Sequence, residues 1–210
     1  MGTVQLVTDS TASFDSPRFA EEHGITVLPM QVQIGDKRFR SGIDIDSEEV
    51  LHQMRHNNAA PRVTAPSIQD FEAIYRDLNR TSDSVCVMLS SQHLTEAYAN
   101  AQSARSSVLG RCEIVVVDSQ SVGMGLGFLV EQVVEAAQKD MTFEEVVRFA
   151  RSIVPRLYSV FYVSDLSYIQ RAGLIGQSQA MLGTMLGIKP LVTIEDGAMI
   201  TMEKARTHTQ

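Results

Sequence analysis

The stretch Ser84–Ala104 places an apolar strand directly before a helix. Val85–Leu89 is a short run rich in β-branched residues, which is typical of a buried strand. From about Leu94 the apolar residues recur at helical spacing, so we expect a helix to begin there. Two hydroxyls, Ser90 and Ser91, lie at the junction. A strand that leads at once into a helix indicates a parallel sheet with crossover helices, which narrows the possible folds more than any other feature of this chain.

Similar junctions occur twice more along the chain. Hydroxyls follow the strand Val4–Val7 at Ser10 and Thr11, and the strand Glu113–Val117 at Ser119. In a doubly wound sheet, ligands lie outside the carboxyl ends of the strands, and helix N-termini favour anions. Each hydroxyl alone could instead cap a helix or close a turn. Together they predict a site for an acidic ligand.

We therefore predict an α/β fold in which residues 1–156 form an N-terminal domain with a doubly wound, mainly parallel sheet. After this point Leu157–Val163 is a tyrosine-rich strand, and Glu195–Gly197 is a turn between two strands of a hairpin. We expect residues 157–210 to form part of a second α/β domain. Because a hairpin with a half-buried face normally needs more sheet, we expect this domain to be truncated at its C-terminus.

Composition excludes several classes of function. The net charge is −7 and the chain has no run of basic residues, which argues against binding to nucleic acid or to an anionic membrane surface. No apolar segment approaches the roughly 20 residues of a membrane span, and the N-terminus lacks the features of a signal peptide. Cys86 and Cys112 lie in or beside apolar strands, as reduced structural thiols do. We therefore expect a cytoplasmic protein.

An enzyme is the alternative hypothesis. Asp9 and Asp118 follow apolar strands at matching places and have serines nearby, which a small phosphotransferase or hydrolase could use. The sequence offers no partner base or nucleophile for them, and aspartate often closes a turn at such places. It also contains no serine or cysteine in a nucleophile elbow. We predict a protein that holds its ligand without transforming it.

Cofactor and metal signals are weak. Gly123–Gly127 has the spacing GxGxG and not the GxGxxG of a dinucleotide loop, so we expect no cofactor. His52 and His56 have the i, i+4 spacing of metal ligands on a helix. The sequence shows no third ligand beside them, so we expect a solvated helix end and no metal. His93 lies in the hydroxyl loop, where filling the loop and contacting a ligand both remain open.

Several motifs occur in a fixed order along nearly the whole chain. They are TDSTA at Thr8–Ala12, ITVLPMQV at Ile25–Val32, APSIQDF at Ala65–Phe71, LSSQHLTEAY at Leu89–Tyr98, VVDSQSVGMGLG at Val116–Gly127, and the segment Ser167–Gly197. In this order they resemble the DegV family, whose members are bacterial fatty acid-binding proteins.

The resemblance implies a two-domain α/β protein, not an enzyme, that encloses one long-chain fatty acid in an apolar tunnel between its domains. In the family two loop hydroxyls hydrogen-bond the carboxylate. We carry these roles to Thr64 and Thr95, with Ser91 in support. The residues expected near the pocket are Ser10, Thr11, His93 and Ser119.

The resemblance also implies a partner. Family members of one type present the acyl group to a fatty acid kinase, and Arg206 matches the position implicated in partner binding. A solvated arginine is the open alternative for Arg206. The chain departs from the family pattern at Val63, which takes the place of the family's threonine in a gap-free match, and at Glu96, which replaces a glycine. A family segment that carries a carboxylate-contacting histidine would lie beyond Gln210.

Overall fold

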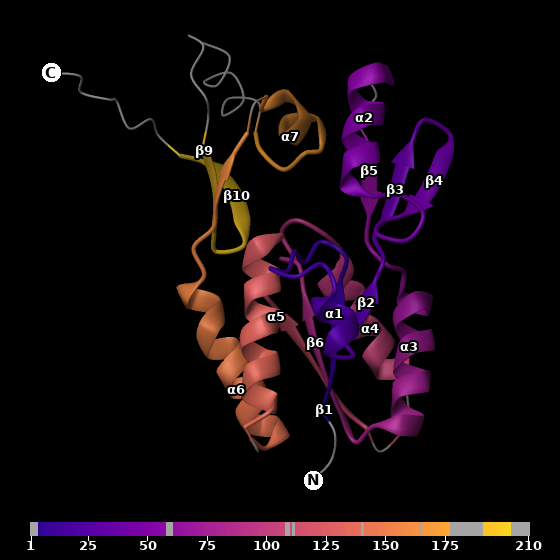
Figure 1. Ribbon diagram of the computed structural model, residues 1–210, viewed down its shortest axis with the longest axis vertical. Coiled ribbons are helices and arrows are strands. Elements are labelled where there is room, and N and C mark those ends of the chain that lie inside the picture. The colour runs from indigo at the N-terminus through magenta and orange to yellow at the C-terminus, as the bar shows by residue number, and fades with distance from the viewer. Residues whose placement is uncertain are drawn as a thin grey trace, which may run out of the picture.

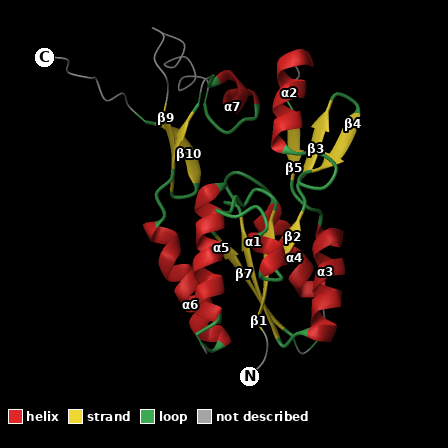
Figure 2. Ribbon diagram, viewed as in Figure 1, coloured by secondary structure: helices red, strands yellow, loops and turns green. Residues whose placement is uncertain are grey.

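The computed structural model describes residues 4–57, 61–107, 110, 112–139, 141–163, 165–176 and 191–202. Its elements follow one another along the chain as drawn in Figures 1 and 2. They are β1 (Val4–Asp9), α1 (Phe19–Glu22), β2 (Thr26–Leu28), β3 (Gln31–Ile34), β4 (Lys37–Arg40), α2 (Ser47–Asn57), β5 (Arg62–Thr64), α3 (Ile68–Thr81), β6 (Ser84–Leu89), α4 (Ala97–Ser107), β7 (Glu113–Asp118), α5 (Met124–Ala137), α6 (Phe143–Ile153), β8 (Val160–Tyr162), α7 (Ser167–Arg171), β9 (Leu191–Glu195) and β10 (Ala198–Thr201).

A four-stranded parallel sheet forms the centre, in the order β2-β1-β6-β7. Successive side chains of each strand point to opposite faces, and both faces are buried. In β6, for example, Val85 and Val87 pack into one core, whereas Cys86 and Met88 pack into the other. This double burial explains why β6 reads as a continuous apolar run, and it confirms the predicted α/β class with a doubly wound parallel sheet.

Helices cover both faces of this sheet, as Figure 1 shows. On one face α3 and α4 supply Phe71, Tyr75, Ala97 and Ala101 to the core. On the other face lie α5 and α6, together with the apolar residues around α1. The alternation of strand and helix therefore builds two apolar layers around one sheet.

The glycine-rich start of α5 serves close packing. A Cβ atom placed on Gly127 would lie 1.8 Å from the carbonyl oxygen of Ser13, and one on Gly125 would lie 2.1 Å from Oγ of Ser121. Only glycine lets the helix approach these loops so closely. The GxGxG spacing thus has a packing explanation.

A small antiparallel sheet, β4-β3-β5, stands apart from the central one. This sheet was not predicted from the sequence. Its apolar face contributes Val32, Ile34 and Phe39 to a cluster that includes Val50 of α2. Figure 2 shows this unit beyond the carboxyl end of the central sheet, at the end opposite to the N-terminus of the chain.

A second antiparallel sheet, β10-β9-β8, follows the central unit in the chain. The predicted hairpin at Glu195–Gly197 is confirmed. Asp196 and Gly197 form its two-residue turn with φ values of 48° and 81°, as a type I′ turn requires. The division of the chain into domains 1–156 and 157–210 stays a prediction. Arg206 lies outside the described residues.

Helix α4 begins at Ala97, three residues later than the predicted start at about Leu94. The N–H groups of Leu94 and Thr95 both donate to the carbonyl of Ser91, at 2.9 and 3.0 Å. These bonds form a separate turn before the helix. The prediction from helical spacing was wrong here because a turn and the first residues of a helix share the same periodicity.

Helix α6 begins with a capping box. Oγ1 of Thr142 accepts from the N–H of Glu145 at 3.3 Å, and the N–H of Thr142 donates to the Glu145 carboxylate at 2.8 Å. This backbone bond, with a second from the Thr142 hydroxyl, holds the pKa of the Glu145 carboxyl below its usual value.

Replacing Thr142 by alanine is expected to lower the free energy of unfolding by about 1 kcal/mol, because the cap hydroxyl is lost. Urea unfolding at neutral pH measures it, and Thr142→Ser, which keeps the hydroxyl, is the control. The part that comes from Glu145 is present above the ordinary pKa of 4.5 and disappears as the pH falls through the lowered value. Equal stability of both variants would contradict the assigned cap.

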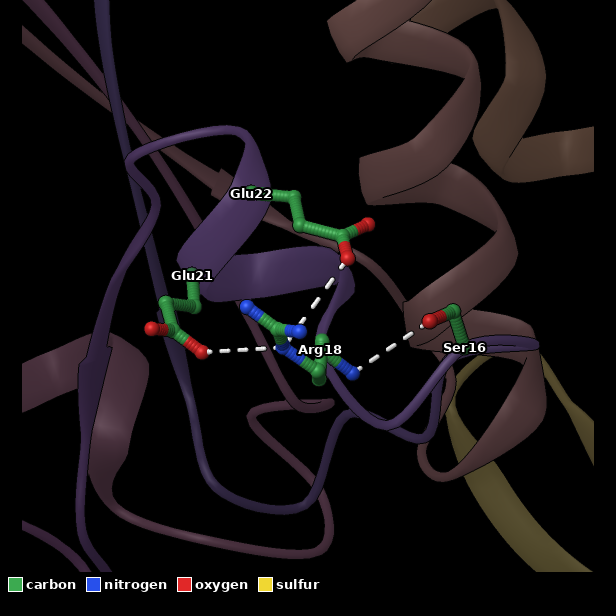
Figure 3. A network of polar contacts seen from close by, with 4 residues as sticks. All are labelled: Ser16, Arg18, Glu21 and Glu22. Carbon is green, nitrogen blue, oxygen red and sulfur yellow. Dashed lines mark hydrogen bonds and ion pairs between the residues drawn. The ribbon is translucent and has the colours of Figure 1, made fainter.

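Arg18, which directly precedes α1, forms two surface ion pairs with residues of that helix (Figure 3). Nε of Arg18 lies 3.4 Å from the carboxylate of Glu21 and 4.0 Å from that of Glu22. The backbone N–H of Arg18 donates to Oγ of Ser16. All three charged side chains are at least half exposed, so water and salt screen these pairs. Helix α1 is held instead by the packing of Phe19 and Ala20 against the core.

Within the described part of the chain, no helix combines the length and apolarity that crossing a membrane requires. Both cysteines are free thiols. Burial raises the pKa of the Cys86 thiol to about 12, which keeps it protonated and unreactive.

Candidate functional site: the carboxyl edge of the central sheet

The ends of β1 and β6 form a topological switch point. These strands are neighbours, but the chain leaves β1 toward the face covered by α5 and leaves β6 toward the face covered by α4. Where the chain leaves two adjacent parallel strands toward opposite faces of the sheet, the two loops diverge. The crevice between such loops is the usual ligand-binding place in α/β proteins. The predicted hydroxyls of both loops meet at this point.

Asp9 organises the switch point. It is fully buried at the end of β1, and one carboxylate oxygen accepts from the N–H and the hydroxyl of Thr11. The other oxygen accepts from the N–H and the hydroxyl of Ser90, both at 2.8 Å. Asp9 therefore closes its own turn and also fixes the loop after β6. Because four donors already bond to its two oxygens, the role of Asp9 is structural.

Thr95 extends this network to the first turn of α4. Its Oγ1 lies 2.9 Å from Oγ of Ser90 and accepts from the N–H of Ala97 at 3.2 Å. The side chain is half-buried. A hydroxyl at the N-terminus of an 11-residue helix lies where the helix dipole favours an anion.

Thr64 is the last residue of β5, and the loop that follows it contacts the same helix. Its side chain is exposed, and its hydroxyl has no hydrogen-bond partner among the described residues. The side-chain amide of Asn100 in α4 donates to the carbonyl of Pro66 at 2.9 Å, which holds the loop after β5 against α4. The structure thus brings the loops of Thr64 and Thr95 to one helix. The role of Asn100 was not predicted, because a contact with a carbonyl 34 positions away leaves no local signal in the sequence.

The other predicted hydroxyls serve the fold. Ser91 is fully buried and donates to the carbonyl of Gly197 at 2.7 Å. Ser10 accepts from the N–H of Met30, and Ser119 donates to the carbonyl of Ser121. The bonds of Ser91 and Ser10 join segments that are far apart in the chain, whereas that of Ser119 closes its own turn. Whether any of these hydroxyls contacts a ligand stays a prediction. His93 is exposed beside the hairpin turn, where a Cβ on Gly197 would lie 3.1 Å from its ring.

Asp118 also closes a turn. Its Oδ1 accepts from the N–H of Gln120 at 2.9 Å and from the N–H of Gln92 at 3.3 Å. Its Oδ2 is buried and has no hydrogen-bond partner in the part of the chain that the structure describes. No hydroxyl among those residues bonds to it, so the acid–hydroxyl pair that the enzyme hypothesis needs is not formed at Asp118 there.

No group of three or more potential metal ligands occurs among the described residues. His52 and His56 stack on each other with ring centroids 4.0 Å apart, and Nδ1 of His56 lies 2.9 Å from the carbonyl of His52. They lie on α2, and no hydrogen bond between described residues links their side chains to the hydroxyls of the edge.

The fold and this edge define a doubly wound α/β protein with a hydroxyl-rich switch point beside a helix N-terminus. A family model described as an uncharacterised protein of the DegV family matches residues 3–210. The chain belongs to the DegV family.

Relatives of known sequence support this membership. A DegV domain-containing protein of Streptomyces coelicolor is 31% identical over 206 residues, which cover 97% of this chain and 72% of that protein. A DegV domain-containing protein of Caldanaerobacter subterraneus is 29% identical over 206 residues, which cover 98% of this chain and 72% of that protein.

Solved structures share the fold. A DegV family protein from Thermus thermophilus, described by its fatty acid binding, is 30% identical with a TM-score of 0.85, over 97% of this chain and 72% of that one. DegV of Bacillus subtilis, described as a fatty acid-binding protein, is 25% identical with a TM-score of 0.86, over 99% of this chain and 73% of that one.

Proposed function

We propose that this protein binds a long-chain fatty acid and acts as its carrier, without catalysing a reaction. The observation that carries the proposal is the likeness to the Thermus thermophilus protein, at 30% identity over 97% of this chain. The hydroxyls of Thr64, at the end of β5, and Thr95, at the start of α4, fit the carboxylate of such a ligand. Its acyl chain would lie in an apolar tunnel between the N-terminal unit and the second unit.

The polar environment of the edge supports a bound carboxylate at Thr95 and not at Asp9. Asp9 is itself an anion and repels a second one. Ser90 lies between Asp9 and Thr95 in the hydrogen-bond network, and Thr95 lies at the N-terminus of α4. Glu96, which replaces the family's glycine, is exposed, so water screens its charge.

The proposal includes the setting in which the carrier works. We place it in the cytoplasm, with a fatty acid kinase as its partner and Arg206 as a residue of the partner-binding surface. No role in binding nucleic acid is proposed, because the net charge of −7 opposes it. Mixing the loaded protein with a fatty acid kinase and ATP tests the partnership, and Arg206→Ala should lower the rate of acyl phosphate formation.

Mass spectrometry of lipids extracted from the purified protein tests the proposed ligand. A stoichiometric fatty acid of 16 to 18 carbons (about the length of common membrane acyl chains) is expected from a bacterial host. If no lipid copurifies and added palmitate does not bind, the carrier function is wrong. A phosphoester turnover that requires Mg²⁺ and is lost in Asp118→Asn would favour an enzyme instead.

Replacing Thr64 by valine is expected to weaken fatty acid binding by roughly 1–3 kcal/mol, because one carboxylate oxygen loses its hydrogen bond. Valine has the same shape without the hydroxyl. A titration with a fluorescent fatty acid measures the dissociation constant, and Thr64→Ser is the matched control because it keeps the donor. Unchanged affinity in Thr64→Val would remove Thr64 from the site.

A further inference from the structure

The tip of the β9–β10 hairpin lies on the loop that follows β6. The hydroxyl of Ser91 donates to the carbonyl of Gly197 at 2.7 Å, and both residues are buried. A Cβ on Gly197 would lie 2.5 Å from Oγ of Ser91 and 3.6 Å from Cα of Gln120. The hairpin tip is therefore in direct contact with the loops after β6 and β7.

Glycine is required at the tip for two separate reasons. Its φ of 81° is a conformation that side chains disfavour, and the contact with Ser91 leaves no space for a Cβ. A turn needed only to reverse the chain would have the first requirement and not the second. The second shows that the tip is shaped to fit the loop that carries Ser91.

The loop that contacts the hairpin also contains Thr95. The carbonyl of Ser91 accepts the N–H groups of Leu94 and Thr95, and Oγ1 of Thr95 bonds to Oγ of Ser90. Ser90 is in turn fixed by Asp9. A single compact turn therefore carries the hairpin contact at one end and the proposed carboxylate donor at the other.

We propose that Ser91 is a positioning residue that latches the β9–β10 hairpin to the Thr95 loop, so that carboxylate binding and docking of the hairpin are coupled. The coupling rests on the proposed function, whereas the latch itself does not. A fatty acid carboxylate on Thr95 orders the turn and strengthens the hairpin contact. By thermodynamic reciprocity, docking of the hairpin strengthens carboxylate binding by the same factor.

Amide hydrogen exchange of the ligand-free protein tests the latch. Ser91→Ala should speed exchange of the β9 and β10 amides by about tenfold, because a buried carbonyl loses its donor when the hairpin is docked. Ser91→Cys, a weaker donor of similar size, should fall between Ser91→Ala and the unsubstituted protein. The β1 and β6 amides should exchange at unchanged rates in both variants.

Tyr75→Phe is the matched control. It also removes a buried hydroxyl that donates to a backbone carbonyl, that of Ala101, but between α3 and α4. It should leave hairpin exchange unchanged. Hairpin exchange in Ser91→Ala that equals that of the unsubstituted protein, or equal acceleration in Tyr75→Phe, would overturn the latch.

Repeating the exchange with saturating palmitate tests the coupling. Palmitate should slow hairpin exchange in the unsubstituted protein and slow it several-fold less in Ser91→Ala. An equal slowing in both would overturn the coupling. If palmitate does not bind to the unsubstituted protein, the proposed function fails and the coupling with it, while the ligand-free comparison still decides whether Ser91 is a latch.

Discussion

Replacing Asp9 by alanine is expected to lower the free energy of unfolding by about 3–5 kcal/mol, the largest effect of any single change at this edge. The buried carboxylate accepts from two backbone amides and two hydroxyls, which belong to Thr11 and Ser90. Alanine leaves these donors without an acceptor in a site that excludes water. Urea unfolding followed by circular dichroism measures the loss.

Two further variants separate the causes of this loss. Asp9→Asn keeps the shape and one accepting oxygen, so we expect a smaller loss than for Asp9→Ala. Asp15→Ala removes an exposed carboxylate from the same loop and should change stability little. A loss below about 1 kcal/mol in Asp9→Ala would contradict the structural role and return Asp9 to the list of candidate catalytic groups.

Replacing Thr95 by valine is expected to weaken fatty acid binding by roughly 1–3 kcal/mol, or about 5- to 150-fold in the dissociation constant. We expect a larger effect than for Thr64→Val. Thr95 is half-buried and lies at the N-terminus of α4, whereas Thr64 is exposed, so a hydrogen bond at Thr95 is less weakened by water. A fluorescent fatty acid titration or calorimetry measures it.

The control for this prediction must separate ligand contact from folding, because Thr95 also accepts from the N–H of Ala97. Thr95→Ser keeps the hydroxyl and should restore most of the affinity. Urea unfolding of Thr95→Val shows how much stability the lost cap costs. Binding that is unchanged in Thr95→Val, in a protein that remains folded, would show that the carboxylate lies elsewhere.

Much of the fold could be predicted because its signals are local. The apolar run Val85–Leu89 lies in a buried strand, and the turn at Asp196 and Gly197 reverses the chain as its residues indicate. The pairing of β3 with β5 in the small sheet was not predicted, because β4 and helix α2 lie between these two strands in the chain. Pairing between segments so far apart leaves no trace in the periodicity of either one.

The hydroxyls at the strand ends were predicted, whereas the contacts they make were not. Hydroxyls at the strand ends were found from their positions in the sequence, and the structure brings those after β1 and β6 to one switch point. Their individual roles depend on contacts that no local pattern records. Asp9 bonds to Ser90 across 81 positions, and Ser91 bonds to Gly197 across 106.

The sequence by itself determined the strand–helix order, the parallel sheet and the family, because each depends on residue patterns that neighbours in the chain create. Only the tertiary structure decided which partner each hydroxyl has. Ser91 and Thr95 are equivalent as residues in a serine- and threonine-rich loop. The hydroxyl of Ser91 donates to the carbonyl of Gly197, whereas the hydroxyl of Thr95 bonds to Ser90 and accepts from the N–H of Ala97. The reason is that folding brings a distant hairpin onto Ser91 and places Thr95 at the N-terminus of α4.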